Sequence, residues 1–133
     1  MKTHLKQIML MLTLVFTFAS CSSDDNDNDS VNRSRDVKYE ITGNYTGDLD
    51  VTYLEKSGAA LNEDIDALPW TKEFTANADS PGASFQTSGY GGVKGQTLTG
   101  KVYVGGKVVK ELTATATEDG IIVLVPSSYV FPR

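Results

Sequence analysis

Apolar and polar side chains alternate with a period of two over much of residues 37–125, and this pattern limits the fold more than any other feature. Val37, Tyr39 and Ile41 alternate with charged or hydroxyl residues, and residues 48–53 repeat the pattern. Such alternation places the apolar side chains on one face of a strand, as in a half-buried antiparallel sheet. Short segments of this kind, spaced about 8–12 residues apart, indicate two packed sheets. We therefore predict an all-β sandwich of about seven antiparallel strands.

The clearest turn is Gly105-Gly106, which is flanked by strand-like residues 98–104 and 107–115. Two glycines permit the positive φ angles of a tight hairpin turn, so these segments should form a hairpin. The continuous apolar run 121–125 predicts a central strand that is buried on both faces and ends at Pro126. Two weaker strands and one short helical candidate complete the prediction: 70–76, 83–88 and 60–68.

Residues 37–133 should form one domain, large enough to bury roughly 60–65% of its unfolded surface. Its predicted core takes apolar residues from the inward positions: Tyr39, Ile41, Leu49, Val51, Tyr53, Trp70, Phe74, Phe85, Val102, Val104, Val108, Leu112, Ile122 and Leu124.

Residues 1–20 have the pattern of an export signal. Lys2, His4 and Lys6 give a basic start, 8–19 is largely apolar, and the small residue Ser20 ends the segment. About a dozen apolar residues span roughly 18 Å as a helix, too short for a ~30 Å hydrocarbon core. We predict a lipoprotein signal peptide over 1–20 with cleavage after Ser20.

Cys21 is the only cysteine of the chain, and the sequence Phe18-Ala19-Ser20-Cys21 resembles a bacterial lipobox. This resemblance implies that Cys21 becomes the first residue and carries the acyl chains, palmitate among them, that bind the protein to a membrane. The alternative is an ordinary signal peptide followed by an unpaired thiol, which is a liability in an oxidising compartment.

Residues 21–36 are rich in aspartate, asparagine and serine, a composition that predicts a disordered tether. The acidic run 24–29 resembles the signal that directs some Gram-negative lipoproteins to the cell surface. We therefore expect an outer membrane lipoprotein exposed on the cell surface, with the periplasmic face as the alternative.

Without its signal the chain lacks histidine, because His4 is the only one, and acylation of Cys21 removes the thiol. Ser-His and Cys-His catalysis and zinc sites with His or Cys ligands are then excluded. The remaining candidates are the carboxylates Asp48 and Asp50 and those of 63–66. A solvated strand face explains them better than a surface calcium site or a glycosidase pair. We predict no enzyme activity, no metal and no cofactor.

Residues 37–133 contain eight basic and twelve acidic residues, a net charge of −4, which argues against nucleic acid as a partner. The glycine-rich stretch 89–95 lacks the spacing of a phosphate-binding loop and is expected to be a flexible connection. Tyr90 at its tip is a candidate contact residue, because exposed aromatic side chains on loops are typical of binding surfaces.

Segments 39–43, 68–70 and 102–111, in this order, resemble the extracytoplasmic domain of the MmpS-type transport accessory proteins. The resemblance implies an Ig-like or transthyretin-like sandwich and a non-enzymatic partnership with an exporter of the resistance-nodulation-division (RND) type. It also makes Trp70 a candidate binding residue, with core packing as the alternative. Members of that family usually have a transmembrane anchor and often a cysteine pair, neither of which is expected here. The second hypothesis is a surface adhesion or ligand-binding lipoprotein without a transporter.

Overall fold

The structure, a computed structural model, describes residues 31–133, which contain ten β-strands and no helix. The strands are β1 (Asp36–Gly43), β2 (Asp48–Leu54), β3 (Ala60–Ile65), β4 (Trp70–Thr75), β5 (Gly82–Ala83), β6 (Phe85–Tyr90), β7 (Thr97–Val104), β8 (Lys107–Thr115), β9 (Ile122–Leu124) and β10 (Tyr129–Val130). Cys21, Ser20 and the tether up to residue 30 lie outside the described residues.

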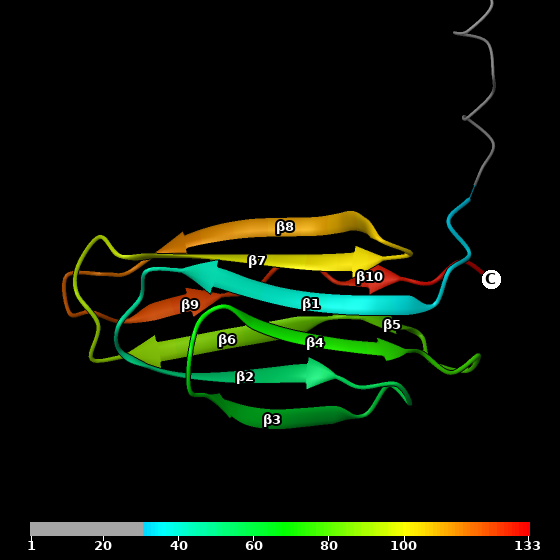
Figure 1. Cartoon of the computed structure of the whole chain (residues 1–133), viewed down its shortest axis with the longest axis horizontal. Coiled ribbons are helices and arrows are strands. Elements are labelled where there is room, and N and C mark those ends of the chain that lie inside the picture. Colours follow the sequence, from blue (N-terminus) through cyan, green and yellow to red (C-terminus); the bar gives the residue numbers. More distant parts are fainter. Residues whose placement is uncertain (1–30) are drawn as a thin grey trace, which may run out of the picture. The chain divides into compact units, whose positions relative to one another are not determined.

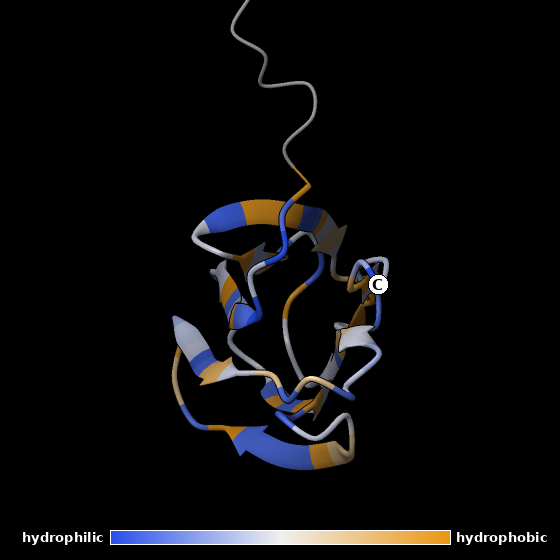
Figure 2. Cartoon of the chain, turned by 90° about the vertical axis from the view of Figure 1, so that its right-hand side faces the viewer, coloured by the Kyte–Doolittle hydropathy of each residue, from blue (hydrophilic) through white to orange (hydrophobic). Residues whose placement is uncertain are grey.

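Eight of the strands form two four-stranded antiparallel sheets, in the orders β4-β1-β7-β8 and β3-β2-β6-β9 (Figure 1). The short strands β5 and β10 pair separately. Seen end-on, the strands surround a common interior (Figure 2). This arrangement confirms the predicted all-β sandwich. We call the outer face of the first four-stranded sheet face A and that of the second face B.

The predicted hairpin is confirmed as β7 and β8 joined by Gly105-Gly106. Both glycines have positive φ angles, 61° and 78°, in the left-handed region that favours glycine. The register shifts between Val102 and Tyr103, which face Lys110 and Val108, so that Val109 is an extra residue in β8. This bulge changes which β8 side chains face the interior.

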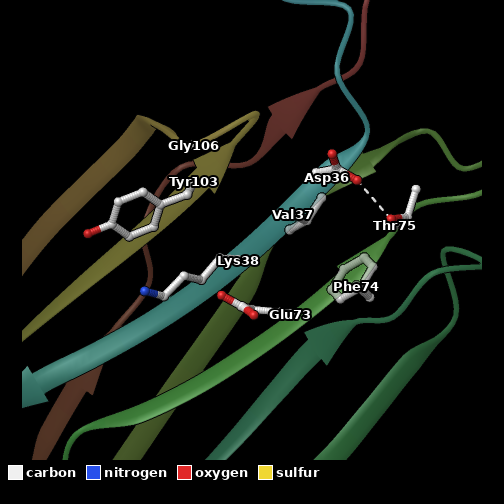
Figure 3. A pocket seen from close by; sticks show the side chains of 8 residues that line it. All are labelled: Asp36, Val37, Lys38, Glu73, Phe74, Thr75, Tyr103 and Gly106. Atoms are coloured by element: carbon white, nitrogen blue, oxygen red, sulfur yellow. Dashed lines mark hydrogen bonds between the residues drawn. The ribbon is translucent and has the colours of Figure 1, made fainter.

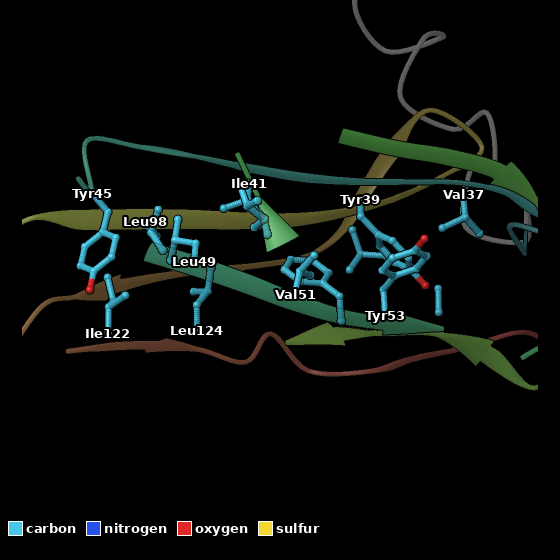
Figure 4. Packing of buried hydrophobic residues seen from close by; sticks show 14 of the residues in the cluster. Val37, Tyr39, Ile41, Tyr45, Leu49, Val51, Tyr53, Leu98, Ile122 and Leu124 are labelled. Carbon is cyan, nitrogen blue, oxygen red and sulfur yellow. The ribbon is translucent and has the colours of Figure 1, made fainter. Parts of the chain in front are cut away.

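The core consists of the inward residues of both four-stranded sheets, and Figure 4 shows many of them. Tyr39 joins the two sheets, because its hydroxyl donates to Leu54 O (2.9 Å) and accepts from Ser84 N (3.0 Å). Burial raises the pKa of the Tyr39 hydroxyl to about 12. The Tyr39 ring also contacts Phe74 and Phe85, with ring centroids 5.5 and 5.4 Å away.

Two predictions about strands were wrong. The run 121–125 is not a central strand buried on both faces: β9 is an edge strand of its sheet, and Ile121, Val123 and Val125 are 46%, 60% and 50% exposed. The helical candidate 60–68 is instead the strand β3, paired with β2 from Leu54↔Ala60 to Leu49↔Ile65.

Two predicted core residues, both on the edge strand β8, are also exposed: Val108 is 45% and Leu112 42% exposed. The bulge pairs Val108 with Tyr103, whose side chain lies on face A. Leu112 pairs with Gly100 at the open side of the sheet, where no further strand covers it. Trp70 and Phe74 pack against the core and are only partly buried.

Residues 32–36, which we assigned to the tether, are instead bonded to the domain. Asn32 Nδ2 donates to Val104 O (2.8 Å), and Arg35 Nη1 donates to Asn77 O (2.8 Å) and Ser80 O (3.0 Å). The guanidinium of Arg35 also lies 4.6 Å from the ring centroid of Phe131. We call this end of the sandwich, where the chain enters, the near end.

Candidate functional site

The opposite end, the far end, is formed by the four connections 44–47, 66–69, 91–96 and 116–121 (Figure 1). The glycine-rich connection is bonded to its neighbours: Gly92 N donates to Gly120 O (3.1 Å) and Gly95 N to Ala116 O (3.2 Å). A Cβ at Gly92 would collide with the ring of Tyr45, so only glycine fits there. Hydrogen bonds and close packing therefore hold this connection against the rest of the far end.

Face A has an open hollow of 580 Å³ along β1 and β4 (Figure 3). Its walls come from three strands and one turn: Asp36, Val37, Lys38, Glu73, Phe74, Thr75, Tyr103 and Gly106. Two pairs of its lining residues contact each other: Asp36 Oδ1 accepts from Thr75 Oγ1 (2.7 Å), and Lys38 Nζ lies 5.1 Å from the ring centroid of Tyr103.

Contacts between charged and polar side chains continue along face A. Lys38 Nζ is 3.6 Å from Glu40 Oε2, and Tyr103 Oη donates to Glu40 Oε1 at 3.2 Å. Lys101 lies directly opposite Glu40 on β7, and Glu111 lies opposite Lys101 on β8. Opposite charges that face each other across strands stabilise a sheet. These charges of β1, β7 and β8 thus stabilise the sheet that carries them.

A second polar cluster closes the open side of the sandwich between the edge strands β3 and β4. Lys72 Nζ is 2.9 Å from Glu63 Oε2, and the Tyr53 hydroxyl donates to the same carboxylate. Hydrogen bonds from Tyr53 and Lys72 lower the pKa of Glu63, and the bond to Glu63 raises the pKa of Lys72. Burial, followed by the bond to Glu63, raises the pKa of Tyr53. Charged side chains that point inward on edge strands discourage pairing with other chains, so we interpret this cluster as protection of the edges.

Trp70 belongs to this closing cluster. Its ring lies 5.7 Å from that of Tyr53, and it packs against the core on the inner side of β4. Tyr90, by contrast, is 67% exposed at the end of β6, opposite Asp48 on face B. The two aromatic residues that the sequence singled out therefore lie on different surfaces, and only Tyr90 is free to contact a partner.

Face B carries a groove above β6. Two hollows of 140 and 190 Å³ share Thr52, Gln86 and Val125 as walls, so they form one depression. Val123 and Val125 form an aliphatic wall on the β9 side. Asp50 and Thr52 of β2 form the opposite wall, and Asp50 Oδ1 accepts from Ser88 Oγ (2.7 Å) on the floor. We call this depression the face B groove.

Sequence reasoning found part of this surface. Asp48 and Asp50 lie on face B, as alternation predicted, and Asp64 faces Asp50 directly from β3. Glu63 points to the other side of β3 and Asp66 lies in the far-end connection, so the acidic stretch does not act as one cluster. The aliphatic wall was missed, because five consecutive apolar residues hide the alternation between 122/124 and 121/123/125. Within residues 31–133 no group of three metal-ligating side chains is present.

No protein-family model and no curated protein matches the chain. The described residues also contain no helix that is long and apolar enough to cross a membrane.

Proposed function

We propose that this chain is a non-enzymatic lipoprotein, anchored through Cys21, whose β-sandwich is an accessory module for transport or for another envelope process. The observation that supports this proposal is that the chain enters the sandwich at one end and leaves the opposite end free. The chain enters at the near end, where Asn32 and Arg35 are bonded to the sandwich. A lipid on Cys21 would attach the domain through this end, so that the far end is the end distant from the point of attachment.

The partner of the first hypothesis is an RND-type exporter, as the resemblance of 39–43, 68–70 and 102–111 to the MmpS-type family implies. A surface adhesion or ligand-binding lipoprotein is the second hypothesis. It is favoured by the acidic run 24–29 and by the exposed Tyr90 at the far end. The outer membrane is the proposed location in both, with the periplasmic face as the alternative orientation.

The anchor is tested by labelling cells with an alkyne analogue of palmitate and comparing the chain with Cys21→Ser. We expect the label and the membrane fraction to depend on Cys21. Label retained by Cys21→Ser would contradict the anchor.

Orientation and partner are tested on the same cells. Protease added to intact cells should degrade the domain if it is surface-exposed, whereas complete protection would place it on the periplasmic face. Site-specific crosslinking from position 90, with position 113 on face A as control, should yield an exporter subunit under the first hypothesis. A crosslink to a surface ligand would favour the second.

A further inference from the structure

The face B groove combines two features that point to one class of ligand. Its sheet is acidic on one side: β2, β3, β6 and β9 contain Asp48, Asp50, Glu63 and Asp64 but no lysine or arginine. Of these carboxylates only that of Glu63, on the inner side, lies within ion-pair distance of a cation in the part of the chain that the structure describes. The three aspartates of face B thus form an uncompensated negative surface.

Two of these aspartates oppose each other. Asp50 and Asp64 are direct cross-strand partners between β2 and β3. Like charges in this position destabilise a sheet. A cation bound beside them would reduce this repulsion, which makes the binding of a basic ligand more favourable.

The other wall of the groove is aliphatic. Val123 and Val125 are 60% and 50% exposed, and Ile121 and Tyr90 extend the same exposed surface toward the far end. Burial of such side chains favours binding by roughly 25 cal/mol per Å² of apolar surface removed from water. One side of a ligand in the groove should therefore be aliphatic and the other cationic.

The length of the groove matches an extended chain. Its floor and near walls include residues 84–88, a span of roughly 13 Å at about 3.3 Å per residue. Asp50 lines the groove, and Asp48, two residues away on the same strand face, lies opposite Tyr90 just beyond it. This is also the spacing of alternate side chains in an extended ligand.

We infer that the face B groove binds an extended polypeptide segment in which basic and aliphatic residues alternate. The basic side chains face Asp48 and Asp50, and the aliphatic ones contact Val123 and Val125. A second copy of this chain is a poorer occupant, because two copies of face B would bring aspartates against aspartates. This inference rests on the proposed binding role and names the chemistry of its partner.

The test uses the full chain in lipid nanodiscs and a fluorescein-labelled peptide of alternating lysine and valine. Fluorescence anisotropy should show binding that weakens as ionic strength rises from about 0.05 to 0.5 M. The double variant D48N/D50N should bind about three- to tenfold more weakly, as expected for two lost charge contacts. V123S/V125S should also weaken binding, by removing the aliphatic wall.

The matched control is E73Q/E111Q, which also removes two negative charges, but from exposed positions of β4 and β8 on face A. It should leave binding unchanged. Equal weakening by this control would show mere attraction to an acidic protein and would overturn the inference. Equal binding of a glutamate–valine peptide would also overturn it, as would self-association of the chain that D48N/D50N strengthens.

Failure here can be told apart from failure of the proposed function. If the inference fails, the peptide does not depend on face B while palmitate labelling still depends on Cys21. If the proposed function fails, the dependence on Cys21 is lost while peptide binding to the purified chain is unaffected.

Discussion

Face A and face B are both outer surfaces of four-stranded antiparallel sheets, and they differ in how their charges are compensated. On face A, Lys38, Glu40 and Tyr103 bond to one another. On face B, Asp50 faces Asp64, and on the other side of β6 the side chains of Val123 and Val125 are exposed. A surface that only has to be soluble needs neither a repulsive pair nor an aliphatic wall. The difference indicates that face A serves stability, whereas face B carries features that stability does not require.

The largest predicted effect on stability concerns β9, whose two sides face the core and the solvent. Leu124 is fully buried and Val123 is 60% exposed on face B. Leu124→Ala should lower the free energy of unfolding by about 3–4 kcal/mol, because it leaves a cavity in the core. Val123→Ala should change it by less than about 0.5 kcal/mol. Urea unfolding measures both, and an equally large loss for Val123→Ala would mean that the exposed valine is structural after all.

The next largest effect on stability concerns Tyr39, which lies in the core between the two sheets. The pKa of Tyr39 is raised from 10.0 to about 12, so folding favours its neutral hydroxyl. This stabilisation is complete below pH 10 and is lost as the pH rises through 12, a fall of about 2–3 kcal/mol for a shift of this size. Tyr39→Phe should be less stable at neutral pH by about 1–2 kcal/mol, because Leu54 O and Ser84 N lose their partner.

The measurement is the free energy of unfolding as a function of pH for both chains. Tyr39→Phe should lose less stability than the unmodified chain between pH 10 and 12. Tyr90→Phe on face B is the matched control and should follow the unmodified chain. Parallel curves for Tyr39→Phe and the unmodified chain would show that the two sheets are not joined through this hydroxyl.

These surfaces also show where sequence reasoning works. Strands β1 and β2 were predicted because their polar residues face solvent and their apolar residues face the core, so the period of two is visible. The period is hidden in β9, where the outward residues are also apolar. It is broken in β3, where Glu63 points inward to meet Lys72 while Asp64 points outward. Both failures occur on edge strands, where burial is not the only requirement that determines which side chains point inward or outward.

The bulge in β8 is the other case. Alternation alone places Val108 inside, and one extra residue at Val109 reverses it. Nothing local in 107–115 marks the position of that residue, because it is set by pairing with β7. The groove was equally out of reach, since its walls come from strands that are far apart in the sequence. Only its acidic wall, Asp48 and Asp50, was visible as a pattern.

The smallest effect is the most direct test of the difference between the faces. Asp64→Asn and Glu40→Gln each remove one negative charge, the first from face B and the second from face A. Asp64→Asn should raise the free energy of unfolding by a few tenths of a kcal/mol, because it removes the repulsion with Asp50. Glu40→Gln should lower it by about 0.5 kcal/mol, because Lys38 loses its ionic partner.

Urea unfolding at low ionic strength and again in about 0.5 M salt measures both variants, since screening should shrink the two effects toward zero. Opposite signs at low salt, converging at high salt, would show that face A is optimised for stability and face B is not. If Asp64→Asn instead lowers stability, Asp64 has a structural role, and the repulsive pair no longer indicates a surface kept for binding.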